Sequence, residues 1–313
     1  MLRLARRLGP VTVLAAALAL AGAACSAAGA AEVPAPAPAA RSSATPSSAT
    51  PSSAASTPAS SSTSSPAGLC VSAAHPQLAV QMSRGIAAAL QGRSSLVGIS
   101  AADPADGITC QLHPEQDFHS ASVVKVIILG ALLSEAQSAH ESLTPAQLTL
   151  AEEMITESDN DAATALWDEV GQAGLQSFLA AAGLTTTVLG PDGYWGLTEV
   201  NARDELLLMQ LLITPNAVLD SSSRSYALGL MADVIPAQRW GVPAGVPSGV
   251  GVHVKNGWLP DPALWVINSI GDFTAAGGDY SIVILTSNNP SMDYGVDTVT
   301  AVATVINQDL GRQ

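Results

Sequence analysis

FHSASVVKVIILGALL, residues 118–133, is an apolar stretch of helical length that contains Lys125, one of only two lysines in the chain. Ser122 precedes this lysine by three residues, and side chains three apart lie on the same face of a helix. The surrounding Val and Ile side chains favour burial, which would lower the pKa of the lysine amine and let it act as a base for the serine hydroxyl. The alternative is a lysine that extends its amine to the surface from the end of a buried helix.

Two further motifs follow in the chain. SDN at residues 158–160 precedes a predicted helix, and KNG at residues 255–257 lies in a predicted strand and contains the second lysine. Taken alone, Ser, Asp and Asn are common helix caps, and a lysine on a strand is usually an exposed charge at a sheet edge. The glycine of KNG permits close backbone approach, and we expect the two lysine amines to converge on the hydroxyl of Ser122.

In their order, the three motifs resemble those of the penicillin-recognising serine hydrolases, the superfamily of class A β-lactamases and D-alanyl-D-alanine peptidases. The resemblance covers most of residues 96–311. Residues 118–125 match the class A spacing F-x-x-x-S-x-x-K, and SDN is followed as in class A by AA at 162–163 and by Leu166. RWGVPAGVP, at residues 239–247, is similar to the segment that leads those enzymes into their K-[ST]-G strand.

The resemblance implies catalytic roles for four residues. Ser122 would be the nucleophile that becomes acylated, and Lys125 would be its base, directly or through a water molecule. Ser158 would pass a proton to the leaving nitrogen. Asn160 would hold Lys125 and the amide of the substrate.

The same resemblance implies a substrate-binding strand made of Lys255, Asn256, Gly257 and Trp258. Lys255 would recognise the substrate carboxylate and help to lower the pKa of the first lysine. The backbone N–H groups of Ser122 and Trp258 would form the oxyanion hole.

Two features depart from the family pattern in ways that affect the substrate. Asn256 stands where the family has a Ser or Thr hydroxyl, and its amide is larger although it can donate a hydrogen bond. The spacing from Ser122 to Ser158 is 36 residues, which is shorter than in typical class A enzymes. A wall of the site would then be missing, and an open groove suits a peptide chain better than a small antibiotic.

A third departure concerns hydrolysis of the acyl-enzyme. Class A β-lactamases activate the deacylating water with the glutamate of an E-x-x-L-N segment, and this chain has GPDGYWGLTEVN at residues 190–201 instead. The nearest carboxylates are Glu199 and Asp192. Each is either a replacement base or a solvated loop charge.

The order of predicted elements indicates an α+β fold. Strands are expected at 95–101, 108–112, 251–256, 263–271 and 279–287. Helices are expected at 75–92, 122–134, 145–156, 161–170, 175–182, 202–212, 223–234 and 294–309. The N- and C-terminal segments would form one antiparallel sheet with flanking helices, and an all-helical lobe, about residues 118–237, would be inserted between them. The groove between two such lobes is a common place for a site.

The first 67 residues are not predicted to fold. Residues 1–25 have the basic start, short apolar run and small-residue end of a secretory signal. Cys25 would be a lipid-attachment cysteine, or an ordinary signal peptidase would cut after Ala23 or Ala30. Residues 26–67 consist mainly of Ala, Pro, Ser and Thr, which favours a disordered tether. The folded domain is then expected at residues 68–313.

Charge and cysteine content narrow the possible partners. The chain has 26 acidic and 12 basic residues and a net charge of −14, which excludes nucleic acid as a partner. Cys70 and Cys110 remain as an even pair in an exported protein, and they form either a disulfide or two buried thiols. We expect a monomer without cofactor or metal, which contacts the membrane only through a lipid anchor.

Two functions are compatible with these features. The first is an exported serine hydrolase of the bacterial cell envelope, secreted or lipid-anchored, which forms an acyl-enzyme at Ser122 with β-lactams or D-Ala-D-Ala-type peptides. Its turnover of β-lactams would be slow because the deacylating glutamate is missing. The alternative is a lipoprotein that binds cell-wall peptides without catalysis.

Overall fold

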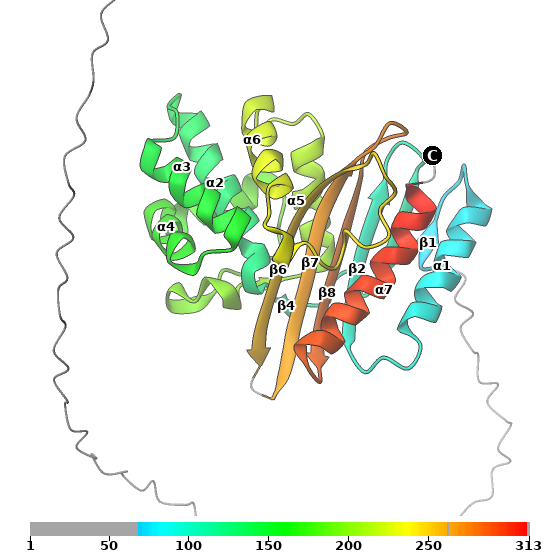
Figure 1. Cartoon of the computed structure of the whole chain (residues 1–313). Coiled ribbons are helices and arrows are strands. Elements are labelled where there is room, and N and C mark those ends of the chain that lie inside the picture. Colours follow the sequence, from blue (N-terminus) through cyan, green and yellow to red (C-terminus); the bar gives the residue numbers. More distant parts are fainter. Residues whose placement is uncertain (1–67, 262, 312–313) are drawn as a thin grey trace, which may run out of the picture. The chain divides into compact units, whose positions relative to one another are not determined.

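The computed structural model describes residues 68–261 and 263–311 (Figure 1). The predicted signal peptide, Cys25 and the predicted tether at 26–67 lie outside the described residues.

The centre of the domain is a six-stranded sheet in the order β1-β3-β2-β8-β7-β6. Its strands are β1 (Cys70–Val71), β2 (Leu96–Asp103), β3 (Ile108–Leu112), β6 (Gly251–Asp261), β7 (Leu264–Thr274) and β8 (Tyr280–Asn289). All neighbouring strands are antiparallel, and β2 pairs with β8 so that the two ends of the chain share one sheet. The α+β fold predicted from the sequence is confirmed, and β6 forms one free edge of the sheet.

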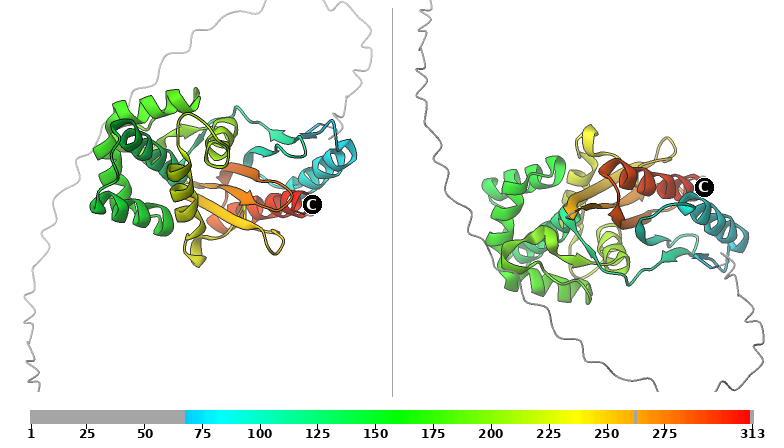
Figure 2. Two further views of the ribbon diagram at one scale, coloured as in Figure 1. Left: turned by 90° about the horizontal axis from the view of Figure 1, so that it is seen from above. Right: turned by 90° about the horizontal axis from the view of Figure 1, so that it is seen from below.

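Two helices from opposite ends of the chain cover one face of this sheet. They are α1 (Pro76–Leu90) and α7 (Met292–Leu310). The helices pack against each other, and α7 also packs on β7 and β8. Both lie on the side of the sheet away from the helical lobe (Figures 1 and 2). The sheet is therefore covered from both sides, as its largely buried strands require.

The inserted lobe is all-helical apart from one short strand pair. Its helices are α2 (Val124–Ala139), α3 (Pro145–Glu152), α4 (Asn160–Ala182), α5 (Ala202–Ile213) and α6 (Ser221–Ala232). Short turns of 3₁₀ or π type occur at Ala121–Val123, Glu153–Glu157, Pro191–Gly193, Trp195–Leu197 and Pro236–Gln238. The strand pair is β4 (Phe118–His119) with β5 (Glu199–Val200). The pair fastens the start of the lobe to the segment that precedes α5.

Helix α2 is the central helix of the lobe. Ten consecutive residues, Val124–Leu133, are buried. The stretch Ala121–Ala139 is long and apolar enough to cross a membrane, but most of it lies inside the domain, as expected for a core helix. One buried position on this helix is Lys125, so its amine is enclosed by protein.

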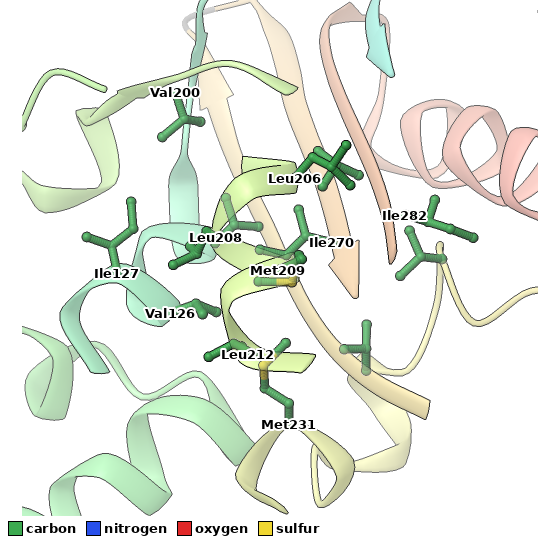
Figure 3. Close-up of a cluster of buried hydrophobic side chains, with 14 of the residues drawn as sticks. Val126, Ile127, Val200, Leu206, Leu208, Met209, Leu212, Met231, Ile270 and Ile282 are labelled. Carbon is green, nitrogen blue, oxygen red and sulfur yellow. The ribbon is translucent and has the colours of Figure 1, made fainter. Parts of the chain in front are cut away.

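Helix α5 joins the lobe to the sheet. Its apolar side chains gather with those of α2, α6 and β7 in one cluster (Figure 3). The labelled members of this cluster are Val126, Ile127, Val200, Leu206, Leu208, Met209, Leu212, Met231, Ile270 and Ile282. Because one core continues from lobe to sheet, residues on α2 and β6 are held at fixed positions relative to each other.

A disulfide joins β1 to β3 at the edge of the sheet opposite β6. Cys70 in β1 lies directly opposite Cys110 in β3, and a disulfide bond joins the two residues. Of the two alternatives for these cysteines, the structure has the bridge. A covalent bond at this position fixes the two-residue strand β1, which pairs with β3 alone.

The structure differs from the predicted elements in a few places. Helix α4 runs across both predicted helices at 161–170 and 175–182, with a break at Gly171, whose φ of 67° is left-handed. Strand β6 continues five residues beyond the predicted end at 256. The two-residue strands of the lobe were not predicted because so short a segment has no periodicity.

Candidate active site

Ser122 lies at the start of the buried helix, in the turn Ala121–Val123. The preceding Ala121 has a left-handed φ of 48°, a conformation that costs energy for a residue with a side chain and is held only by its surroundings. The side-chain amide of Asn268 donates to the carbonyl oxygens of His119 (2.9 Å) and Ser120 (3.0 Å) and holds the chain just before this turn. Ser122 is thereby left half-buried at the wall of a pocket.

Lys125 follows one helical turn later and is fully buried. Its Nζ donates to the carbonyl oxygen of Ser158 (2.7 Å), to Oδ1 of Asn160 (2.8 Å) and to the Ser158 hydroxyl (3.2 Å). Burial lowers the pKa of Lys125 to about 7, against the opposing effect of the Asp159 carboxylate. An amine with this pKa is neutral in a large share of molecules at neutral pH and can accept a proton.

Lys255 reaches the same place from the edge strand β6. Its Nζ donates to the Ser158 hydroxyl (2.9 Å) and to the carbonyl oxygen of Asn256 (3.0 Å). Burial and the nearby charge of Lys125 lower the pKa of this amine well below its usual value. The two amines do converge on one hydroxyl, but it is that of Ser158 and not that of Ser122.

The SDN motif has both of the roles considered for it. Ser158 ends the π turn Glu153–Glu157 with a left-handed φ of 61°, which brings its carbonyl oxygen and its hydroxyl to the lysines. Asp159 is a helix cap, since its carboxylate accepts from the backbone N–H of Ala162 (2.7 Å). Asn160 is the first residue of α4 and bonds to Lys125. The motif therefore starts a helix and also places three polar groups, two from Ser158 and one from Asn160, on the first lysine.

Gly257 permits close contact between β6 and the serine turn. A Cβ at this position would lie 2.7 Å from the backbone nitrogen of Ser122 and 2.9 Å from the carbonyl oxygen of Ser120. A side chain here would push the strand away from Ser122. The next residue, Trp258, lines the pocket and packs against Trp240 with ring centroids 6.0 Å apart.

Asn256, which was predicted to bind the substrate, has a different role in the structure. Its amide donates to the carbonyl oxygens of Gln238 (2.8 Å) and Trp240 (2.9 Å), and the side chain is buried. Successive side chains of a strand point to opposite faces, so Asn256 points away from the face that carries Lys255. It fastens the segment that precedes β6 and does not line the pocket.

The two carboxylates considered for deacylation, Glu199 and Asp192, are not among the residues that line the pocket beside Ser122. Glu199 is exposed in β5 and lines a separate hollow with Asp117, His119 and Asp261. Asp192 is exposed and is not among the residues that line the pocket beside Ser122.

The pocket beside Ser122 has a volume of about 460 Å³ and is largely apolar. It is lined by Ala121, Ser122, Asn160, Thr164, Gly193, Tyr194, Trp195, Gly196, Leu197, Trp258 and Leu259. None of these residues carries a carboxylate. Sequence reasoning missed Thr164 and Tyr194, and the aromatic pair inside the glycine-rich GPDGYWG segment was the available signal for Tyr194.

The loop that carries these aromatic residues is anchored by Asp204 at the start of α5. One carboxylate oxygen of Asp204 accepts from the backbone N–H and the hydroxyl of both Thr186 and Thr187, at 2.8 to 3.2 Å. Asn201 caps the same helix by accepting from the N–H of Asp204 (2.9 Å). The pocket wall is thus tied to a helix that belongs to the main core.

A comparison with models of known protein families identifies the family of this chain. A family model described as the beta-lactamase enzyme family matches residues 141–310, which is more than half of the chain. The chain belongs to the beta-lactamase enzyme family. The matched range contains SDN and KNG, and it begins after Ser122 and Lys125. A search of curated proteins finds no match.

Solved structures with the same fold include beta-lactamases and a protein named PBP-A. A class A beta-lactamase from Bacteroides cellulosilyticus DSM 14838 has a TM-score of 0.66 and 14% identity, covering 75% of this chain and 98% of that one. A beta-lactamase from Sphaerobacter thermophilus DSM 20745 has a TM-score of 0.65 and 21% identity, over 74% and 97%. PBP-A has a TM-score of 0.64 and 20% identity, over 75% and 97%. At these identities the likeness shows the fold.

The low pKa of Lys125 in this beta-lactamase-family site leads to a pH prediction. Only the neutral amine accepts a proton, so acylation is expected to rise with pH through about 7, the pKa of Lys125, and to level off above it. The rate constant for adduct formation with a penicillin, measured from pH 5.5 to 9, checks this. A rate that is flat or falling between pH 6 and 8 would contradict the assignment of Lys125 as the base.

Proposed function

We propose that this protein is a serine hydrolase that forms an acyl-enzyme at Ser122 with β-lactams or with peptides that end in D-Ala-D-Ala. One observation carries the proposal: two buried lysine amines lie 2.9 and 3.2 Å from the Ser158 hydroxyl, beside a pocket that Ser122 lines. A buried lysine pair of low pKa has a clear catalytic use as a proton acceptor and relay. The likeness to PBP-A adds support, since a variant of that protein was solved as an acyl-enzyme complex with penicillin G.

The proposed acylation uses the groups in a definite order. The oxygen of Ser122 attacks the substrate carbonyl carbon while neutral Lys125 takes the hydroxyl proton. The developing negative charge on the carbonyl oxygen is stabilised by the backbone N–H groups of Ser122 and Trp258, which the glycine at 257 keeps close together. When the C–N bond breaks, Ser158 gives its proton to the leaving nitrogen and regains one from Lys125.

The proposed hydrolysis of the acyl-enzyme is slow. Water must attack the ester, and the described residues that line the pocket offer no carboxylate to activate it. A positioned general base contributes roughly 10²–10⁴-fold to such a step. We therefore expect the acyl-enzyme to accumulate on treatment with a penicillin.

The proposal includes export to the bacterial cell envelope, with Cys25 as lipid anchor or with a cleaved signal. The sequence of residues 1–25 supports it. The disulfide between Cys70 and Cys110 supports it independently, because such bonds persist in oxidising compartments.

Intact mass spectrometry after incubation with penicillin G tests the proposed function. Wild type is expected to gain the mass of one penicillin molecule, retain it for hours, and carry it on the peptide that contains Ser122. The Ser122→Ala variant is expected to gain no mass. If neither a penicillin nor a depsipeptide labels wild type, the proposal is wrong.

A binding protein for cell-wall peptides is the second candidate. The pocket without a carboxylate and the diverted amide of Asn256 favour it. Calorimetry with a D-Ala-D-Ala peptide would then give the same affinity for wild type and Ser122→Ala. A hydrolysis rate that disappears in the Ser122→Ala variant would exclude this candidate.

A further inference from the structure

Trp195 contacts the catalytic lysine from the pocket side. The centre of its indole ring lies 4.8 Å from Nζ of Lys125. The indole Nε1–H donates to the hydroxyl of Thr164 (3.1 Å), which in turn donates to the carbonyl oxygen of Asn160 (3.0 Å). The ring is therefore fixed by the first turn of α4, the same turn that carries a ligand of the lysine.

The contacts of the Lys125 amine show what the indole ring of Trp195 adds to its surroundings. The three hydrogen bonds of Nζ go to groups of Ser158 and Asn160. The charged groups that act on this lysine are the Asp159 carboxylate and the amine of Lys255. The aromatic ring adds a face that attracts an ammonium group and that cannot hold water in place.

We propose that Trp195 is a positioning residue, which holds the amine of Lys125 toward Ser158 and keeps water from reaching that amine in the acyl-enzyme. The proposal rests on the function proposed above and deepens it. In deacylation, a water oxygen attacks the ester carbon, its proton passes to a base, and the Ser122 oxygen leaves and takes up a proton. None of the described residues that line the pocket carries a carboxylate. The amine of Lys125 is then the base for this step, and the indole ring covers it.

The lifetime of the acyl-enzyme tests the exclusion of water. Wild type and variants are acylated with penicillin G, free penicillin is removed, and loss of the adduct is followed by intact mass. Trp195→Ala is expected to shorten the lifetime by tenfold or more, and Trp195→Phe, which keeps an aromatic face, to remain within about threefold of wild type. Trp265→Ala, which removes a half-buried indole outside the pocket, is the matched control and is expected to leave the lifetime unchanged.

A shorter lifetime of the acyl-enzyme in Trp195→Ala would distinguish the positioning role of Trp195 from a purely structural role. Damage to the fold would slow acylation and lower the melting temperature, but it would not speed hydrolysis of an ester already formed. An unchanged or longer lifetime in Trp195→Ala, with wild type acylated normally, overturns the inference and leaves the proposed function standing.

A second measurement does not depend on acylation. The chain has only two lysines, so the spectrum of protein labelled with ¹³C-lysine contains two sets of side-chain signals. The Hε signals of Lys125 are expected to be shifted upfield by the indole ring in wild type, and this shift is expected to disappear in Trp195→Ala. If the Hε signals of both lysines are unshifted in wild type, the positioning role is wrong, whatever the acylation measurements with penicillin show.

Discussion

Replacing Lys125 by methionine is expected to slow acylation of Ser122 by about 10²–10⁴-fold, the range that a positioned general base contributes. The variant keeps a buried side chain of similar length but has no atom that can take the serine proton. The rate of adduct formation with a penicillin at pH 8, where the wild-type amine is mostly neutral, is the measurement.

Lys125→Arg is the matched control for charge. A guanidinium keeps the positive charge but does not deprotonate in proteins, so this variant is expected to be as slow as the methionine variant. Circular dichroism melts separate loss of chemistry from loss of fold. A methionine variant that acylates within threefold of wild type would exclude Lys125 as the base.

Replacing Asp204 by alanine is expected to lower the free energy of unfolding by about 3 kcal/mol, since each buried donor that loses its acceptor costs about 1–3 kcal/mol. The carboxylate is 1% exposed and accepts four hydrogen bonds from Thr186 and Thr187. Its removal leaves buried donors without acceptors. Urea unfolding monitored by circular dichroism gives the difference.

Asp168→Ala is the control for loss of an acidic side chain. Asp168 is exposed in the middle of α4, and its replacement is expected to change the free energy of unfolding by no more than about 0.5 kcal/mol. An Asp204→Ala variant as stable as this control would show that the threonine pair is solvated and that the loop 190–201 is not anchored through α5.

Much of the fold could be predicted because the strands and helices have clear patterns. The strand at 108–112 matches β3, and the late strands at 251–256, 263–271 and 279–287 fall within or close to β6, β7 and β8. The extension of β6 past Gly257 was not predicted, since a proline at 260 disfavours a strand interior. The edge position of β6 explains why that proline is tolerated there.

The candidate site was predictable where motifs carry it and unpredictable where contacts are distant in sequence. The motifs located both lysines, which lie on α2 and β6, and Ser158, which lies in the turn just before α4. Asn256 was misassigned although strand alternation alone places it on the face opposite Lys255. Trp195 could not have been placed over Lys125 from the sequence, because that contact depends on how the loop after α4 folds back.

The disulfide has a mechanical consequence. Tension applied to the chain ahead of Gly68 enters the domain at β1, and the covalent bond from Cys70 passes that load directly to β3. Strand β6, which carries Lys255, forms the opposite border of the sheet. Pulling from the N-terminal side therefore loads the linked border first, at the edge of the sheet opposite the strand that carries Lys255.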